Sequence, residues 1–204
     1  MIVSVNADVK KSLMQNSEFS ELFKNNCMNS KFLSVEKNNS EIIGACFVGG
    51  FLNSNGIEIN EKYRGKGLGK KLLYEVLDEC KIRKISLLTG VFKPSNVISI
   101  KTHIKIGYKP VFSVFYNKDE GREIIVINPL NSKGELFLNF VKIFNTKIGN
   151  IFFSFLWILM RPFLKNLIVF PGNKIPKIDF INSIKKFEKV KKTIKDIQIN
   201  LEKN

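Results

Sequence analysis

Three glycines and four cations fall within nine residues of this chain, in the stretch YRGKGLGKK at residues 63–71. An alternating run, GIEIN at residues 56–60, precedes the stretch, and leucines with helical spacing follow it. This order predicts a strand, a tight glycine turn and a helix. Because backbone amides at such a turn and at a helix N-terminus point the same way, an anionic group such as a phosphate fits there.

Two common phosphate-binding motifs do not fit this stretch. The Walker A motif requires a glycine at position 64 and a serine or threonine at position 71, where the chain has Arg64 and Lys71. The dinucleotide fingerprint fits Gly65 and Gly67 but requires a third glycine where the chain has Lys70. Both motifs are therefore excluded.

The rest of the chain predicts an α/β fold on a mixed sheet. Alternating and β-branched runs between turn residues predict strands at 32–37, 42–50, 56–60, 84–92, 111–117 and 122–128. Helical spacing predicts helices at 9–15, at 18–24, from Leu68 to Cys80, and from Asn96 to a stop at Gly107. The order is strands, then strand–helix twice, then a closing hairpin.

The pattern Arg-Gly-x-Gly-x-Gly resembles the signature of the GNAT superfamily of N-acetyltransferases. IEINEKYRGKGLGKKLL, from residue 57, resembles the family's fourth strand, pyrophosphate loop and third helix, and NVISIKTHIKIGYKP, from residue 96, resembles a later family segment. The resemblance covers residues 32–127. It implies a mixed, mostly antiparallel sheet flanked by helices, acetyl-CoA as the acyl donor, and a primary amine as the acceptor.

The resemblance also implies where acetyl-CoA binds. The main chain of Ile57, Glu58 and Ile59 would pair with the pantetheine arm. The cations around the glycine turn oppose the helix dipole unless an anion is present, which favours a bound anion. The amides expected to hold the diphosphate belong to Arg64, Gly65, Lys66, Gly67, Leu68, Gly69 and Lys70.

The expected chemistry involves a second stretch. Asn96, Ser99 and His103 are spaced i, i+3 and i+7 and form a polar stripe on one helix face, with Asn96 and Ser99 expected at the cofactor. Many relatives have a tyrosine at the position of His103, where it protonates the CoA thiolate. Histidine exchanges protons near neutral pH and can do the same. The alternative is that His103 only packs within the fold.

The general base of several relatives is missing, because Val91 occupies its position. Glu58 is the best replacement base, and an outward-facing strand role for Glu58 stays equally open. Two other functions therefore stay open: an acetyltransferase acting on protein α-amines or lysines, and a CoA-binding or membrane-adaptor protein without catalysis.

The composition limits the partners. Thirty-three Lys and Arg against 18 Asp and Glu give a net charge of +15, which favours an anionic partner unless it reflects general composition. The three cysteines show no disulfide or zinc pattern, so no metal is expected. Charged residues occupy the place of a signal peptide's apolar region, which predicts a cytoplasmic protein.

Residues 128–204 lie beyond the resemblance, so we predict a GNAT domain at 1–127 and a basic helical extension at 128–204. The extension holds 14 Lys and Arg against 5 Asp and Glu, which is +9 of the net charge. Its longest uncharged stretch, 148–160, would give about 20 Å of helix, too short to cross a ~30 Å hydrocarbon core.

Two interpretations of the extension stay open. One is a helical hairpin broken at Pro162 that lies in a membrane interface, where Trp157 and the flanking cations suit it. This interpretation is favoured and predicts a peripheral protein on the inner membrane face, with an amine acceptor on a sugar or lipid-linked envelope precursor. The other is packing on the domain or on a second copy. The apolar stripe at 180–201 suits anionic lipid or a homodimeric coiled coil. Nucleic acid is not expected, because no stacking platform accompanies the charge.

Overall fold

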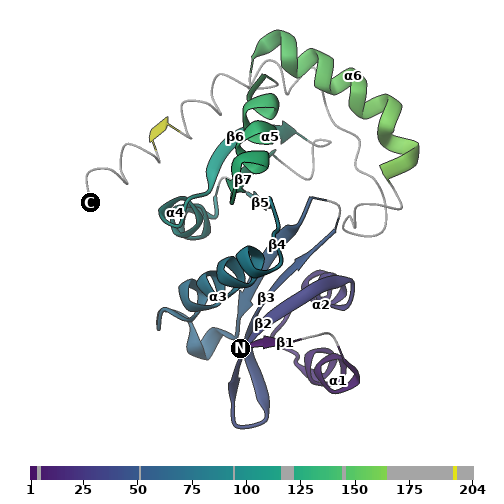
Figure 1. The fold of residues 1–204 in the computed structure, drawn as a ribbon. Coiled ribbons are helices and arrows are strands. Elements are labelled where there is room, and N and C mark those ends of the chain that lie inside the picture. The colour runs from purple at the N-terminus through teal and green to yellow at the C-terminus, as the bar shows by residue number, and fades with distance from the viewer. Residues whose placement is uncertain are drawn as a thin grey trace. The chain divides into compact units, whose positions relative to one another are not determined.

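The structure of this chain is a computed structural model that describes residues 1–3, 6–50, 52–93, 95–115, 122–143, 146–164 and 195–196. The chain divides into two compact units, Met1–Leu88 and Thr89–Asn204. The strands follow the order β1-β2-β3-β4-β5-β7-β6 in a mixed, mostly antiparallel sheet of seven strands (Figure 1), which confirms the predicted fold class. The predicted domain boundary at 127/128 lies inside the second unit and stays a prediction.

The first unit is a small antiparallel sheet with helices on both faces (Figure 1). Leu33 and Phe47 pack with α1 and α2 on one face, whereas Gly44 meets Leu72 of α3 on the other. The elements are β1 (Ile2–Val3), α1 (Ala7–Gln15), α2 (Glu21–Met28), β2 (Ser30–Asn38), β3 (Glu41–Gly49), β4 (Ser54–Ile59), the 3-10 helix η1 (Glu61–Tyr63) and α3 (Leu68–Ile82).

Aromatic rings hold α2 on the sheet. The ring centroids of Phe19 and Phe23 lie 5.4 Å apart, and those of Phe23 and Phe47 lie 5.6 Å apart, both tilted. Tilted pairs at this distance stabilise a core beyond the area that they bury. The loop before α2 is therefore anchored to the strands, and this loop carries Ser20, which matters for the site below.

The second unit is built around an antiparallel hairpin of β6 and β7, on which α5 packs. Asn131 caps α5 by accepting hydrogen bonds from the amides of Lys133 (3.0 Å) and Gly134 (3.1 Å). The elements are β5 (Leu87–Phe92), whose first residues belong to the first unit, α4 (Val97–Lys105), β6 (Lys109–Phe115), β7 (Arg122–Pro129), α5 (Ser132–Lys142) and α6 (Lys147–Leu164).

Most predicted elements are confirmed to within a few residues, and two differences stand out. The short strand β1 was not predicted, because two residues carry no periodicity and pair only once β2 is in place. The predicted helix break at Pro162 was wrong, because α6 continues to Leu164. A proline in the last turn removes only one helical hydrogen bond. The stripe at 180–201 and the side chain of Trp157 lie outside the described residues.

Candidate functional site

The glycine turn has the backbone that the sequence predicts. Gly65 and Gly67 both have φ of 77°, the left-handed conformation that side chains disfavour. A Cβ built on either glycine would meet no atom within 4 Å. Glycine is therefore required here by backbone conformation and not by lack of space, and the turn is open to a ligand.

The turn leads into a helix N-terminus that no side chain caps. Gly67 is the N-cap of α3 and has no side chain that could accept a hydrogen bond from the first amides, and the first turn has no acidic residue. The first amides of a helix have no partner within the helix and carry its positive end. The amides from Leu68 to Lys70 are thus suited to bind an anion.

The cations of this stretch lie beside the turn. Arg64 donates from Nε to the carbonyl oxygen of Ile59 at 3.1 Å, and Lys66 lies 5.1 Å from the ring centroid of Tyr63. Lys71 is different, because its Nζ lies 2.6 Å from a carboxylate oxygen of Glu36. That hydrogen bond raises the pKa of Lys71. In the described part of the chain, Lys71 is the only cation of this turn that pairs with a carboxylate, so the charges of Arg64, Lys66 and Lys70 can serve an added anion.

Glu58 is tied to the loop before α2. Its Oε2 accepts a hydrogen bond from the backbone N–H of Ser20 at 2.8 Å, and its Oε1 accepts one from the Ser20 hydroxyl at 2.5 Å. Ser20 is also the N-cap of α2. A carboxylate has about four lone-pair sites, so these two bonds leave capacity to accept a proton. Both the base and the structural role of Glu58 stay compatible with this geometry.

The neighbours of Glu58 on β4 keep the predicted strand register. Ile57 pairs with Cys46, and Ile59 pairs with Gly44, in the antiparallel ladder of β3 and β4. Both isoleucines are half-buried. The strand runs through η1 directly into the glycine turn, so one continuous segment carries all the predicted site residues of the first unit. Their role in binding pantetheine stays a prediction.

The predicted residues of the second unit lie on α4. Asn96 is the N-cap of this helix and accepts a hydrogen bond from the amide of Ser99 at 3.3 Å. His103 is buried, with 1% exposure, and its ring lies 4.5 Å from the ring of Phe92 and 4.9 Å from that of Tyr108. Helix capping and ring packing explain why these residue types occur here.

The protonation of His103 follows from its surroundings. Its Nδ1 lies 2.8 Å from the carbonyl oxygen of Ser99, which can only accept, so Nδ1 carries the proton. Burial lowers the pKa of His103, although this hydrogen bond opposes the shift. A neutral ring protonated at Nδ1 accepts a proton at Nε2 more readily than it gives one. This favours the packing alternative, and the acid role stays a prediction.

Comparison with known proteins identifies the family. Residues 10–108 match the acetyltransferase (GNAT) family. Over these residues the chain belongs to that family. A search of curated proteins found no match.

Solved structures share the fold of the GNAT part of this chain. The IAA acetyltransferase from Bacillus cereus is 19% identical, covering 64% of this chain and 99% of that chain with a TM-score of 0.52. The ribosomal-protein-S18-alanine N-acetyltransferase from Escherichia coli is 19% identical, and the match covers 64% of this chain and 94% of that chain with a TM-score of 0.51. A GNAT acetyltransferase from Elizabethkingia anophelis, solved with acetyl-CoA bound, is 19% identical. The match covers 64% of this chain and 97% of that chain with a TM-score of 0.50. At this identity the similarity shows the fold.

Sequence reasoning missed one residue of this GNAT site, Ser20. A serine before Glu21 and an apolar run is a signal for a helix start. Nothing local, however, indicates that Ser20 contacts Glu58, because the two residues are 38 positions apart and meet only when α2 docks on the sheet. The structure thus adds a hydrogen-bond partner for the predicted base.

The packing role of His103 makes a testable prediction about pH. The pKa of His103 is lowered in the folded protein, so the unfolded chain binds more protons and the free energy of unfolding rises with pH. This contribution is complete above the unfolded pKa of about 6.5 and is lost as pH falls below it. We expect urea unfolding to show this loss in the wild type and not in His103→Phe. The same slope in both proteins would contradict the assignment.

Proposed function

We propose that this GNAT chain transfers an acetyl group from acetyl-CoA to a primary amine. The observation that carries the proposal is the glycine turn, in which two left-handed glycines lead into the uncapped, acid-free N-terminus of α3. A diphosphate matches both the amides and the adjacent cations. The acetyl-CoA bound in the Elizabethkingia anophelis relative supports the choice of this nucleotide.

The residues of the first unit have separate roles in binding acetyl-CoA and in the reaction. Bound acetyl-CoA supplies an activated acetyl thioester. The amides of the turn and of α3 hold the diphosphate, with Arg64 and Lys66 beside it. Glu58 accepts, directly or through water, the proton that the amine loses while its nitrogen bonds to the carbonyl carbon. The carbon–sulfur bond then breaks, and the thiolate takes up a proton from solvent.

Direct transfer is favoured over an acetylated enzyme. The three cysteines are buried, and burial raises the pKa of Cys27, of Cys46 and of Cys80, the last to about 12. A thiol attacks as its thiolate, so these cysteines are poor nucleophiles at neutral pH. The acetyl group therefore passes to the amine in one step, and initial rates should show no ping-pong pattern.

Two measurements test the proposed function. Calorimetry with CoA should detect binding to the full chain, and thiol release from acetyl-CoA should depend on an added amine. Binding with no turnover on any amine would favour the CoA-binding adaptor. No binding would overturn the donor assignment itself.

For the acceptor we propose an amine on a sugar or a lipid-linked molecule presented at a membrane surface. The support is the exposed apolar surface of α6 described below, which suits a protein working beside lipid. An amine panel should contain amino sugars, lipid-linked amines, and peptides with α-amines or lysines. Preference for peptides would favour the protein acetyltransferase alternative.

A further inference from the structure

Helix α6 exposes a broad apolar face. Seven large apolar side chains on this helix are each more than half exposed, from 53% to 82%. Their spacing of i, i+3, i+4, i+7, i+10, i+11 and i+15 places them on one side of the helix. They are Ile148, Ile151, Phe152, Phe155, Ile158, Leu159 and Phe163, and we call this set the α6 face.

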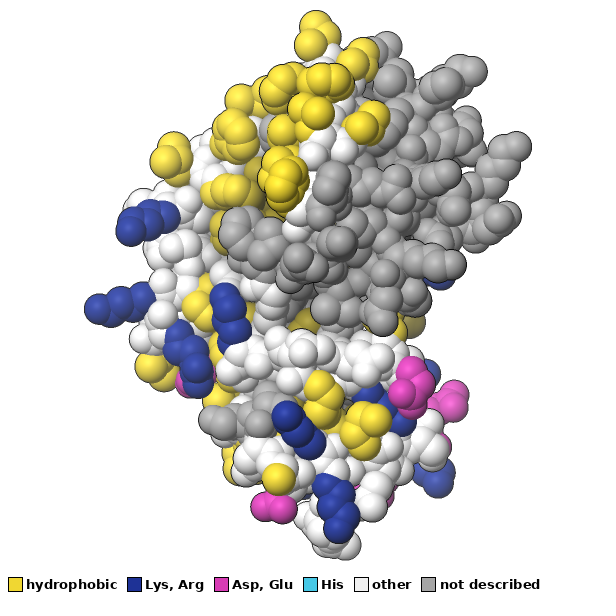
Figure 2. Space-filling view, turned by 90° about the vertical axis from the view of Figure 1, so that its right-hand side faces the viewer, with side chains coloured by type: hydrophobic (Ala, Val, Ile, Leu, Met, Phe, Trp, Pro, Cys, Tyr) yellow, Lys and Arg dark blue, Asp and Glu magenta, His cyan; other side chains and the backbone are white. Residues whose placement is uncertain are grey.

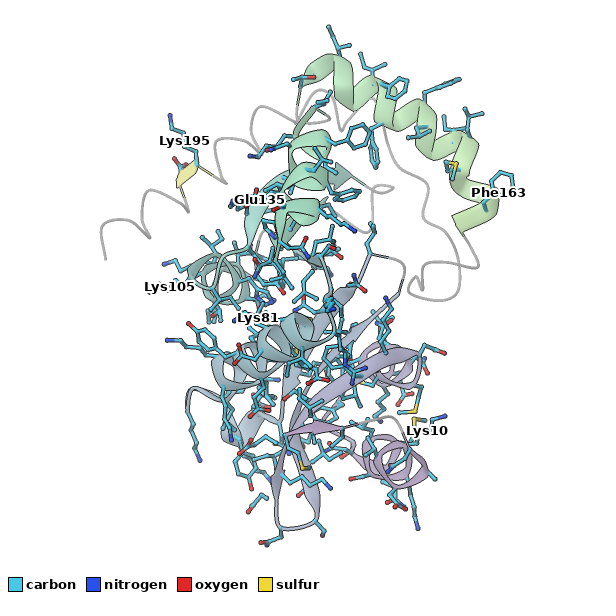
Figure 3. The ribbon with its side chains drawn as sticks, in the orientation of Figure 1. Lys10, Lys81, Lys105, Glu135, Phe163 and Lys195 are labelled. Atoms are coloured by element: carbon cyan, nitrogen blue, oxygen red, sulfur yellow. The ribbon has the colours of Figure 1, made fainter. Side chains whose placement is uncertain are left out.

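The figures show the same feature. Figure 2 shows apolar side chains gathered around α6, at the top of the view, and Figure 3 shows Phe163 pointing away from the helix. Soluble proteins rarely expose a large contiguous apolar patch unless it binds something. We therefore expect the α6 face to bind a partner.

Helix α5 has an apolar side beyond the one that it packs. Gly134, Leu138 and Val141 are buried in the unit, whereas Leu136 and Ile143, on the opposite side, are 74% and 58% exposed. The exposed side forms part of an apolar hollow lined by Lys133, Leu136, Phe137, Asn139, Phe140 and Ile143. Both helices after the β6–β7 hairpin thus present apolar surface.

The charges around these helices indicate which kind of partner the α6 face binds. No acidic residue occurs between Glu135 and Asp179. An anionic surface complements such a segment, whereas a second copy of the chain would bring like charges together at a cost. The segment contains six cations, which are Lys142, Lys147, Arg161, Lys165, Lys174 and Lys177.

The length of α6 determines how it can meet a bilayer. Its 18 residues give roughly 27 Å of helix at 1.5 Å per residue. None of the helices in the described part of the chain is long and apolar enough to cross a membrane. An apolar helix face with cations nearby suits the plane of the headgroups, where side chains reach the acyl chains and cations meet phosphates.

We propose that the α6 face docks on an anionic lipid surface, with α6 lying in the plane of the headgroups. The apolar side chains of the α6 face enter the boundary of the acyl chains. The positive charge that this acid-free sequence carries favours a surface of anionic lipid phosphates. This docking is separate from acetyl transfer and would hold even if the chain transferred a different group.

Co-sedimentation of the full chain with vesicles tests the docking. We expect pelleting with phosphatidylcholine–phosphatidylglycerol vesicles, weaker pelleting with phosphatidylcholine alone, and a decrease at about 1 M salt, where charges are screened beyond ~3 Å. Ile158→Glu should lower the partition coefficient by roughly ten-fold or more, because an apolar contact is lost and a carboxylate is added near lipid phosphates.

Ile82→Glu is the matched control, because Ile82 is a 74% exposed isoleucine on α3. It should pellet as the wild type does, and both variants should keep the wild-type circular dichroism. Absence of wild-type pelleting, or equal pelleting of Ile158→Glu and the wild type, would overturn the proposal. So would a wild-type dimer that Ile158→Glu dissociates while vesicles bind neither protein.

Discussion

Replacing Glu58 by glutamine is expected to lower kcat for acetyl transfer by about 10²- to 10⁴-fold, the usual contribution of a general base. The amide is nearly the same size as the carboxylate. Its oxygen can accept from the Ser20 N–H, and its NH₂ group can donate to the Ser20 hydroxyl oxygen, so both contacts at this position survive. The variant therefore removes proton acceptance and leaves the bridge to α2 in place. Steady-state thiol release with a saturating amine measures the effect.

Ser20→Ala is the matched control for Glu58→Gln. It keeps the carboxylate but removes the hydroxyl bond to Glu58 and the side-chain cap of α2. Losing an N-cap costs about 1 kcal/mol of stability, which thermal unfolding detects. We expect kcat to fall much less in Ser20→Ala than in Glu58→Gln. If Glu58→Gln keeps wild-type kcat, Glu58 holds the α2 loop and is not the base.

The second large effect is expected at the glycine turn. In Gly65→Ala/Gly67→Ala, two side chains must adopt φ of 77°, at about 1–2 kcal/mol each. A Cβ at either position would lie in open space, so the free variant has room to relax to a negative φ. Binding must then restore the original conformation. We expect the Kd for CoA to rise roughly 30- to 700-fold, as measured by calorimetry.

Gly50→Ala is the control that distinguishes the effect of backbone strain from the loss of CoA binding. Gly50 also has a positive φ, of 69°, and a Cβ there would meet no atom within 4 Å, but it follows β3 and is not part of the glycine turn. The substitution should cost comparable stability and leave the affinity for CoA unchanged. Equal CoA affinity in the double variant and the wild type would mean that the turn does not bind the diphosphate.

The turn and its flanking elements could be predicted because their signals are local. A glycine at φ of 77°, a strand with alternating residues and a helix with leucines three and four apart all act within a few residues of the chain. The N-cap role of Asn96 is local in the same way. The family resemblance rested on these signals, and the match over residues 10–108 confirms it.

The roles of Glu58 and His103 could not be settled by such signals. The position of Glu58 in an alternating strand shows only that it faces away from Ile57 and Ile59. Its bridge to Ser20 forms when α2 docks through Phe23 on Phe47. His103 shares a helical face with Asn96 and Ser99, and only the packing of Phe92 and Tyr108 shows that it is buried.

The amino-acid sequence by itself determined the order of elements, the glycine turn, the family and the cationic, acid-free segment after Glu135. Each of these depends on residue type and short spacing. Tertiary structure alone decided that Glu58 contacts Ser20, that His103 is buried as a neutral ring, and that α6 runs through Pro162 with one apolar face exposed. The physical reason is that burial and proton affinity depend on groups distant in the chain, which meet only after folding.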